Sequence, residues 1–377
     1  MSLMQPILRR WNRITGGGSE FSVTVPVMDG PLKPNDAIER TALVASLPGA
    51  GTLVRRGETL LFGRGREVLA WKASGGAAIL ATVEGEISAL AVASDGSLAI
   101  GVAGQGVVID APDGSRRVVK GAGLACVTAL CFLPDGALAI ANGSLDVAPG
   151  DWAHDLLGHG QSGSVALVGP GATEARVLVD GLRFPSGLCA VAGAPDRLAV
   201  CEAWAHRIVE VSVSERRVVG VLSEQLPCYP ARLSSRAGGG YVLASYSVRS
   251  QLIEFVLRER RFLRRMREEV APEFWIAPSL RSGDSFKEPL QAGGVIRLGI
   301  HKPWAPTRSY GLLIGLSPSF QPVWSAHSRA DGKRHGVTSV TEWGEGLAAL
   351  SQGNGDLFLL DGAGRPIVGS TATEGGA

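Results

Sequence analysis

Histidine and hydroxyl side chains near the end of the sequence have the types and spacing that proton transfer requires. His335 is followed by Thr338 and Ser339, where an apolar strand is predicted to begin. An imidazole titrates near neutral pH and is the usual general acid or base in enzymes. We therefore take His335, Thr338 and Ser339 as candidate catalytic residues. The alternative interpretation of His335 is a solvent-facing loop histidine.

Two further histidines lie in a segment rich in Gly and Asp. His154 and His159 are close in sequence to Asp151 and Asp155, and they are candidate bases as well. Common catalytic motifs are missing, because the sequence has no Gly-x-Ser-x-Gly elbow, Walker loop, His-Glu-x-x-His helix or EF-hand loop. The five cysteines form no Cys-x-x-Cys pair, which favours reduced, structural thiols.

The elements that must position these residues repeat along the chain. A tight polar turn followed by a short apolar strand is clear at residues 56–62, 94–100 and 134–140, and weaker at 195–200, 239–243 and 344–349. Each copy follows another apolar strand, which indicates antiparallel hairpins. A spacing of about 40 residues fits one four-stranded propeller blade. The repeat predicts an all-β fold, a six-bladed β-propeller.

Two long gaps in the repeat predict insertions at residues 142–164 and 251–308. We expect one propeller domain over residues 45–377, with an extension, residues 1–44, that packs partly on it. The second insertion contains a predicted amphipathic helix, residues 251–269, and a loop cap. The helix has apolar residues at helical spacing, namely Leu252, Phe255, Val256, Phe262, Leu263 and Met266. Its arginines leave two interpretations: packing on its own domain, or peripheral contact with a membrane.

Charge and hydropathy exclude several classes of protein. Thirty-seven Lys and Arg residues against 35 Asp and Glu leave a net charge of +2, without the basic excess that nucleic-acid binding needs. No stretch approaches the roughly 18 to 20 apolar residues that span a bilayer, so we expect no integral membrane segment. The first residues do not have the pattern of a secretory signal. We expect a cytoplasmic protein whose partner is a small molecule.

Several blade motifs resemble a known family. Residues 180–188 read Asp-Gly-Leu-Arg-Phe-Pro-Ser-Gly-Leu, and related motifs occupy residues 201–208, 226–233, 239–244 and 336–340. Together they resemble the strictosidine-synthase-like and SMP-30/gluconolactonase-like six-bladed propellers, in particular the bacterial branch. The resemblance implies a small-molecule hydrolase of lactone or ester type that acts in the central channel of the ring.

The sequence departs from that family where its metal-dependent members bind a divalent cation, usually calcium. Their oxygen donors are replaced here by Ser186, Ala231 and Arg232. Calcium requires six to eight oxygen ligands, so we expect a degenerate metal site and no cofactor. Asn142, in a neighbouring loop, is an alternative oxygen donor. The catalytic glutamate of strictosidine synthase falls near Thr338, which argues against that activity.

The resemblance places the side chain of Arg232 where the cation of those relatives would lie, so we expect a fixed positive charge in place of a removable one. A guanidinium pairs with a carboxylate or phosphate through two parallel hydrogen bonds. We take Ser186, Arg232, Asn142 and Tyr246 as candidate ligand-binding residues. Two functions remain open. The first is hydrolysis of a lactone or ester, with water activated by His335 or by a metal that the degenerate site still holds. The second is non-catalytic or metal-independent binding of an anionic small molecule through Arg232. Arg232 has a further interpretation, a salt bridge to a neighbouring blade.

Overall fold

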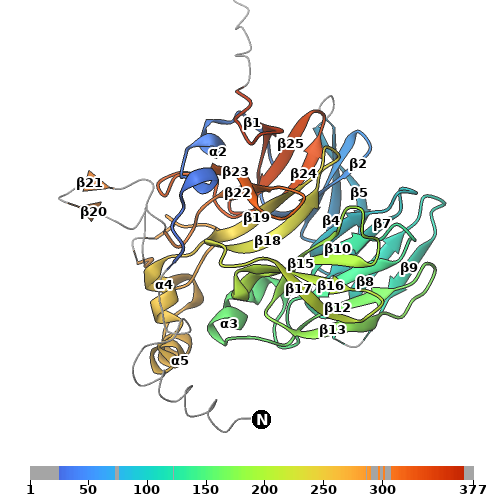
Figure 1. Ribbon diagram of the computed structural model, residues 1–377, viewed down its shortest axis with the longest axis horizontal. Coiled ribbons are helices and arrows are strands. Elements are labelled where there is room, and N and C mark those ends of the chain that lie inside the picture. Colours follow the sequence, from blue (N-terminus) through green and yellow to red (C-terminus); the bar gives the residue numbers. More distant parts are fainter. Residues whose placement is uncertain are drawn as a thin grey trace, which may run out of the picture.

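Six four-stranded antiparallel sheets, the blades, surround one axis in the computed structural model (Figure 1). The structure describes residues 25–72, 76–121, 123–285, 287–289, 296–297, 300–301 and 307–368. Within these residues the sheets are built mainly from strands that are consecutive in sequence, as the hairpin repeat predicts. The prediction of an all-β, six-bladed β-propeller is confirmed.

The blades follow the order of the sequence. Blade 1 contains β2 (Ala50–Arg56), β3 (Thr59–Arg64), β4 (Glu67–Lys72) and β5 (Gly76–Thr82), and blade 2 contains β6 (Ile87–Val92), β7 (Leu98–Val102), β8 (Gly106–Asp110) and β9 (Arg116–Val119). Blade 3 contains β10 (Val127–Phe132), β11 (Leu138–Asn142), β12 (Gly163–Val168) and β13 (Arg176–Leu182). Blade 4 contains β14 (Pro185–Ala190), β15 (Arg197–Glu202), β16 (Arg207–Ser212) and β17 (Arg217–Ser223).

The last two blades are interrupted or completed by distant segments. Blade 5 contains β18 (Cys228–Ser235), β19 (Tyr241–Val248), β22 (Leu312–Leu316) and β23 (Pro322–His327), so an insertion separates its second and third strands. Blade 6 contains β24 (Val337–Trp343), β25 (Gly346–Ser351), β26 (Asp356–Asp361) and, outermost, β1 (Leu43–Ser46). Pairing of β1 with β26 closes the ring, and the innermost strands contact one another in succession from β2 round to β24.

The hairpin turns have the backbone that the polar repeat predicts. Gly57, Gly96 and Gly136 occupy the left-handed region, with φ of 57°, 89° and 84°. Glycine adopts this conformation without steric cost. The strands that follow the turns are mainly apolar, and every residue of β7 and β11 is buried. The repeated turn and strand therefore supply both the hairpins and the core between neighbouring blades.

The insertions hold most of the helices. The first contains η3 (Pro149–Asp151) and α3 (Trp152–Leu157), although the sequence indicated only a loop there. The second contains α4 (Gln251–Val256), α5 (Arg260–Glu269), η5 (Pro272–Phe274) and a short pair of strands, β20 (Ile296–Arg297) and β21 (Ile300–His301). Other short helices are η2 (Gly30–Leu32), α2 (Ala37–Arg40) and η4 (Ala203–Ala205). None of the described helices is both long and apolar enough to cross a membrane.

The prediction of one continuous helix over residues 251–269 is wrong. The backbone N–H groups of Arg258 and Glu259 bond to carbonyls three residues back, which forms a tight turn between α4 and α5. The turn also changes the buried face, since Leu252, Phe255 and Phe262 are 42%, 51% and 46% exposed. Three residues of the predicted apolar face, Val256, Leu263 and Met266, are buried as expected. They pack with Ile253 and Leu257 on α3 and on blade 4. Figure 1 shows α3, α4 and α5 gathered on one side of the ring.

Candidate functional site

The six innermost strands each have an irregular register near their first residues. In five blades the residue at this irregularity is Gly51, Ser88, Thr128, Ser186 or Thr338. In blade 5 the irregularity extends from Tyr229 to Leu233 and includes Arg232. Bulges of this kind re-aim side chains and are common near active sites. Arg232 therefore occupies a place where the other blades carry glycine or a hydroxyl.

Polar groups from five blades converge on a central pocket of about 210 Å³. This volume lies below the range of about 300–1,000 Å³ that is typical of sites for drug-sized ligands, so it suits only a small ligand. Its lining includes Gly51, Glu86, Ser88, Thr128, Trp152, Arg232, Tyr246, Leu280 and Gln352. Larger hollows lie elsewhere on the molecule, but we place the candidate site here because these groups meet at the axis.

Arg232 joins four blades at the centre of this pocket. Its Nη1 donates to the carbonyl of Gly51, at 3.2 Å, and to Oγ of Ser339, at 3.0 Å. Its Nη2 donates to the carbonyl of Ser88, at 2.5 Å, and its Nε is buried without a hydrogen-bond partner. Three of the five N–H groups of the guanidinium are thus used, and all three partners are neutral oxygens.

The positive charge of Arg232 has no carboxylate in ion-pair contact within the described part of the chain. Burial lowers the pKa of Arg232, although an arginine remains charged at neutral pH. A buried charge without a counter-charge is costly, and an anion beside it removes much of that cost. The salt bridge to a neighbouring blade that the sequence left open is not formed among the described residues. The pocket therefore favours a negatively charged or carbonyl-bearing ligand.

Aromatic rings form one wall of the pocket. Tyr246 packs on Trp152 of α3, with ring centroids 5.3 Å apart, and Trp152 packs in turn on Trp204 at 5.9 Å. Burial raises the pKa of Tyr246 to about 12, while the charge of Arg232 opposes this shift. The phenol therefore stays protonated at neutral pH and can donate a hydrogen bond to an anion.

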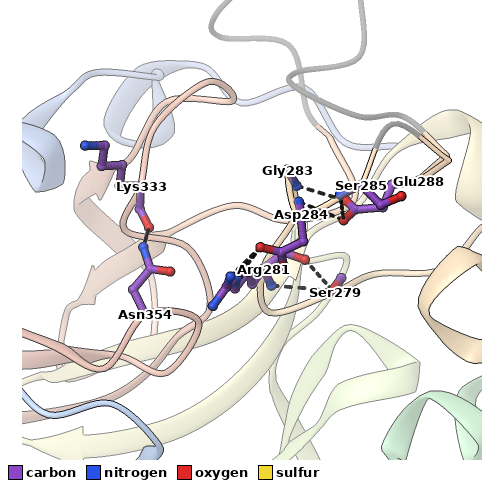
Figure 2. Close-up of polar contacts among 8 residues, drawn as sticks. All are labelled: Ser279, Arg281, Gly283, Asp284, Ser285, Glu288, Lys333 and Asn354. Carbon is purple, nitrogen blue, oxygen red and sulfur yellow. Dashed lines mark hydrogen bonds and ion pairs between the residues drawn. The ribbon is translucent and has the colours of Figure 1, made fainter.

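A hydrogen-bonded turn brings Leu280 to the pocket, and the backbone N–H of Ser279 joins it to the carbonyl of Arg308 at 2.7 Å. Ser279 Oγ donates to the carbonyl of Arg281 at 2.6 Å, and Arg281 pairs with Asp284. The carboxylate of Glu288 accepts from the backbone N–H groups of residues 283, 284 and 285, as Figure 2 shows. These local bonds fix the segment that carries Leu280, and the sequence indicated only a loop cap here.

Glu86 is the only carboxylate among the described residues that line the central pocket. It lies just before β6, and its side chain is exposed. Sequence reasoning missed it, together with Ser88 and Thr128. An alignment of the six innermost strands with one another would have found Ser88 and Thr128, because both stand at the repeated bulge.

Two predicted ligand-binding residues use their polar groups within the protein. Ser186 Oγ donates to the carbonyl of Pro230 in the next blade at 2.8 Å. Asn142 accepts from the backbone N–H of Cys126 at 2.7 Å and donates to the carbonyl of Ser144 at 2.8 Å. Both are buried, and neither lines the central pocket. Of the predicted ligand-binding residues, the pocket brings together Arg232 and Tyr246.

The predicted catalytic residues lie at the start of blade 6. His335 is 4% exposed, with Nε2 2.8 Å from the carbonyl of Arg329 and Nδ1 2.7 Å from Oγ of Ser309. Because a carbonyl only accepts, Nε2 carries the proton and Nδ1 accepts from the Ser309 hydroxyl. Burial lowers the pKa of His335. His335 does not line the pocket, so its catalytic role stays a prediction without support from the pocket lining.

Thr338 and Ser339 do not line the pocket, but each contacts a residue that does. Thr338 Oγ1 donates to Oε1 of Gln352 at 2.9 Å, and Gln352 lines the pocket. Ser339 accepts from Arg232. Both hydroxyl groups belong to side chains that are fully buried. These hydrogen bonds position Gln352 and Arg232, and a catalytic role of Thr338 and Ser339 stays a prediction.

The residues of the pocket do not fit a calcium ion. No group of three His, Cys, Asp or Glu side chains suited to a metal occurs in the part of the chain that the structure describes. The guanidinium of Arg232 offers only donors, whereas calcium requires oxygen acceptors. We therefore assign no chemical step in this pocket to a metal.

The ring of six blades defines the chain as a six-bladed β-propeller, and comparison with solved structures agrees. It is similar to regucalcin, a calcium-binding protein from Agrobacterium tumefaciens (12% identity, TM-score 0.54, 88% of this chain and 97% of that one). It is also similar to a gluconolactonase from Xanthomonas campestris (13% identity, TM-score 0.51, 86% of this chain and 88% of that one). A third similar structure is a luciferin-regenerating enzyme (12% identity, TM-score 0.51, 89% of this chain and 97% of that one).

At these low sequence identities, the comparisons with solved structures show the fold and nothing about function. No protein-family profile matches the sequence, and no curated protein matches it either. The expected likeness to gluconolactonase-like propellers is confirmed at the level of the fold. The strictosidine-synthase-like part of that expectation stays a prediction.

Proposed function

We propose that the chain binds a small molecule that bears a carboxylate, in the central pocket and without a metal. The observation that carries the proposal is the guanidinium of Arg232, which is held by neutral oxygens and lacks a carboxylate partner among the described residues. A carboxylate beside it would supply the missing negative charge and accept the N–H groups that remain. The volume of about 210 Å³ favours a ligand no larger than a single sugar.

Other groups in the pocket fit such a ligand. Tyr246 is a neutral donor for a second carboxylate oxygen or a hydroxyl group. Gln352 and Glu86 can bond to further hydroxyl groups of the ligand, and Trp152 covers an apolar face. A short-chain hydroxy acid combines these features. We therefore propose hydroxy acids as the ligand class.

Calorimetric titration of the full chain with glycolate, lactate and gluconate tests the proposal. We expect at least one of these acids to bind and its methyl ester to bind more weakly. Arg232→Met should weaken the binding by about ten- to a hundredfold, because hydrogen bonds to charged groups contribute about 1.5–3 kcal/mol. Arg308→Met is the matched control, since it removes another buried arginine outside the pocket. Failure of all three acids to bind, or equal losses in both variants, would contradict the proposal.

A second candidate function is hydrolysis of the lactone that corresponds to such an acid. It is favoured by Glu86 in the pocket lining and by the structural likeness to a gluconolactonase. Glu86 would take a proton from water as the water oxygen bonds to the lactone carbonyl carbon. Arg232 would stabilise the negative charge that develops on the carbonyl oxygen. The ring C–O bond then breaks, its oxygen takes the proton from Glu86, and the hydroxy acid remains bound at Arg232.

A further inference from the structure

A groove of about 440 Å³ lies between α3 and α5, apart from the central pocket. Its lining comprises His154, Leu157, Gly158, His159, Arg260, Leu263, Arg264, Arg267 and Glu268. None of these residues lines the central pocket. The volume lies within the range of about 300–1,000 Å³ that is typical of ligand sites. The groove is therefore large enough to be a second site.

Three arginines of α5 share one side of this groove. Arg260, Arg264 and Arg267 are four and three residues apart, so they lie on one face of the helix. No hydrogen bond or ion pair joins any of the three to a carboxylate in the described residues, although Glu268 is near. In contrast, Arg265, on another face of the same helix, pairs with Glu269 at 3.0 Å. Positive charge is concentrated on the face that meets α3.

The opposite wall is formed by the end of α3. His159 follows the helix with a left-handed backbone, φ 56°, and His154 lies edge-on to Trp275, with ring centroids 4.6 Å apart. Arg267 reaches this wall, since its Nη1 lies 3.6 Å from the position that a Cβ on Gly158 would take. Leu263, which is buried, anchors α5 against the hydrophobic cluster beneath. Two imidazoles and three guanidinium groups thus face one groove between two packed helices.

We propose that this groove binds a phosphate monoester group. Three arginines with Glu268 leave an excess of two positive charges, which matches a phosphate monoester of charge about −1.5 to −2 at pH 7. Such a group also offers three acceptor oxygens to several guanidinium forks at once, whereas one carboxylate is satisfied by a single fork. His154 adds an imidazole on the α3 side, whereas the imidazole of His159 is already hydrogen-bonded to the backbone of Leu257. The phosphate belongs either to a soluble metabolite or to the headgroup of a lipid, because the groove is open at the surface.

The two sources are distinguished by two titrations of the full chain. The first uses inorganic phosphate and glycerol phosphate in a calorimeter. The second measures co-sedimentation with phosphatidylcholine vesicles that contain phosphatidic acid, against vesicles of equal surface charge made with phosphatidylserine. Binding of the soluble phosphates identifies a metabolite site, and binding confined to phosphatidic acid vesicles identifies a headgroup site. Both results support the proposal.

Substitutions on the two faces of α5 provide the decisive control. Arg264→Gln and Arg267→Gln should each weaken phosphate binding by about tenfold or more, because each removes charged hydrogen bonds. Arg265→Gln removes the same charge from the same helix and should leave binding unchanged. All three residues are exposed, so we expect each variant to fold, which circular dichroism verifies. The proposal is overturned if neither soluble phosphate nor phosphatidic acid binds, if phosphatidylserine vesicles bind equally well, or if Arg265→Gln loses as much affinity as Arg264→Gln.

Discussion

The central pocket and the His335 cluster differ in how their polar groups are satisfied. Around Arg232, the guanidinium has neutral partners only, and its Nε has none. Around His335, both ring nitrogens have partners, one in Ser309 and one in the carbonyl of Arg329. The first region therefore retains bonding capacity for a ligand, and the second has used its capacity to hold the fold. Residue type alone would have favoured the histidine as the functional group.

If the central pocket is the functional region, the largest effect should come from replacing Glu86, its candidate general base. If the central pocket hydrolyses lactones, Glu86→Gln should lower kcat by about a hundredfold or more, since a general base contributes about 10²–10⁴-fold. Binding of the hydroxy acid product should be retained. Release of acid from a panel of small lactones, followed with a pH indicator, measures the rate.

Glu84→Gln serves as the control for that experiment. Glu84 is two residues earlier, is exposed and does not line the central pocket. Full activity in Glu86→Gln would eliminate Glu86 as the base, and the absence of hydrolysis by the unmodified chain would eliminate the second candidate function.

The His335 cluster should respond in stability instead. His335→Ala removes one partner of the Ser309 hydroxyl and the imidazole that donates to the Arg329 carbonyl in a buried region, which costs about 1–3 kcal/mol. Urea denaturation measures the loss, and hydroxy acid affinity should not change. If affinity or hydrolysis fell while the free energy of unfolding stayed constant, His335 would be a functional residue. The distinction between a functional central pocket and a structural His335 cluster would then be wrong.

Tyr246 should have a smaller effect on the central pocket. Tyr246→Phe removes one neutral donor and should weaken ligand binding by about two- to tenfold, the equivalent of about 0.5–1.5 kcal/mol. Because the pKa of Tyr246 is about 12, the phenol stays protonated from about pH 6 to 9, and its contribution should be constant there. At higher pH its ionisation would add a negative charge beside Arg232 and weaken binding. A dependence on Tyr246 that changed near pH 7 would contradict this pKa.

Arg232 should matter little for stability, although it contacts three other blades. Arg232→Met removes three hydrogen bonds, but it also removes the cost of burying a charge without a counter-charge, and the two effects oppose each other. We expect Arg232→Met to change the free energy of unfolding by less than about 1 kcal/mol. If the free energy of unfolding fell by several kcal/mol and ligand affinity stayed unchanged, Arg232 would have a structural role, as we expect for His335.

Metal ions should have the smallest effect. The donors at Arg232 do not suit calcium, so neither added calcium nor a chelator should shift the Tm or the affinity for the hydroxy acid. Differential scanning calorimetry with and without calcium tests this expectation. A clear rise in Tm with calcium would contradict it.

The sequence predicted the features that repeat and missed those that depend on a single contact. Turns such as Gly96 and Gly136 occur once in each blade, so their spacing revealed six sheets. The place of Arg232 in the channel followed from a family resemblance, and the pocket agrees with it. The contacts of Arg232 with Ser88 and Ser339 join residues 144 and 107 positions apart, which no local pattern reveals.

The insertions were predicted less well because tertiary packing decides their structure. Helix α3 is short, and Asp155 secures it through Ser144 at 2.6 Å and Trp204 at 2.8 Å, contacts that its composition does not indicate. The apolar spacing from Leu252 to Met266 suggested one helix, but a turn divides it and leaves Phe255 exposed. Helical periodicity shows where the apolar residues lie on a helix, but it does not show which of them pack against other elements.

Diffraction from crystals soaked with a short-chain hydroxy acid tests the central claim most directly. The account predicts electron density for the carboxylate at hydrogen-bond distance from the guanidinium of Arg232, with Tyr246 within reach of the same ligand. Density for the acid at a remote position, or a multiply coordinated cation in the central pocket, would contradict it.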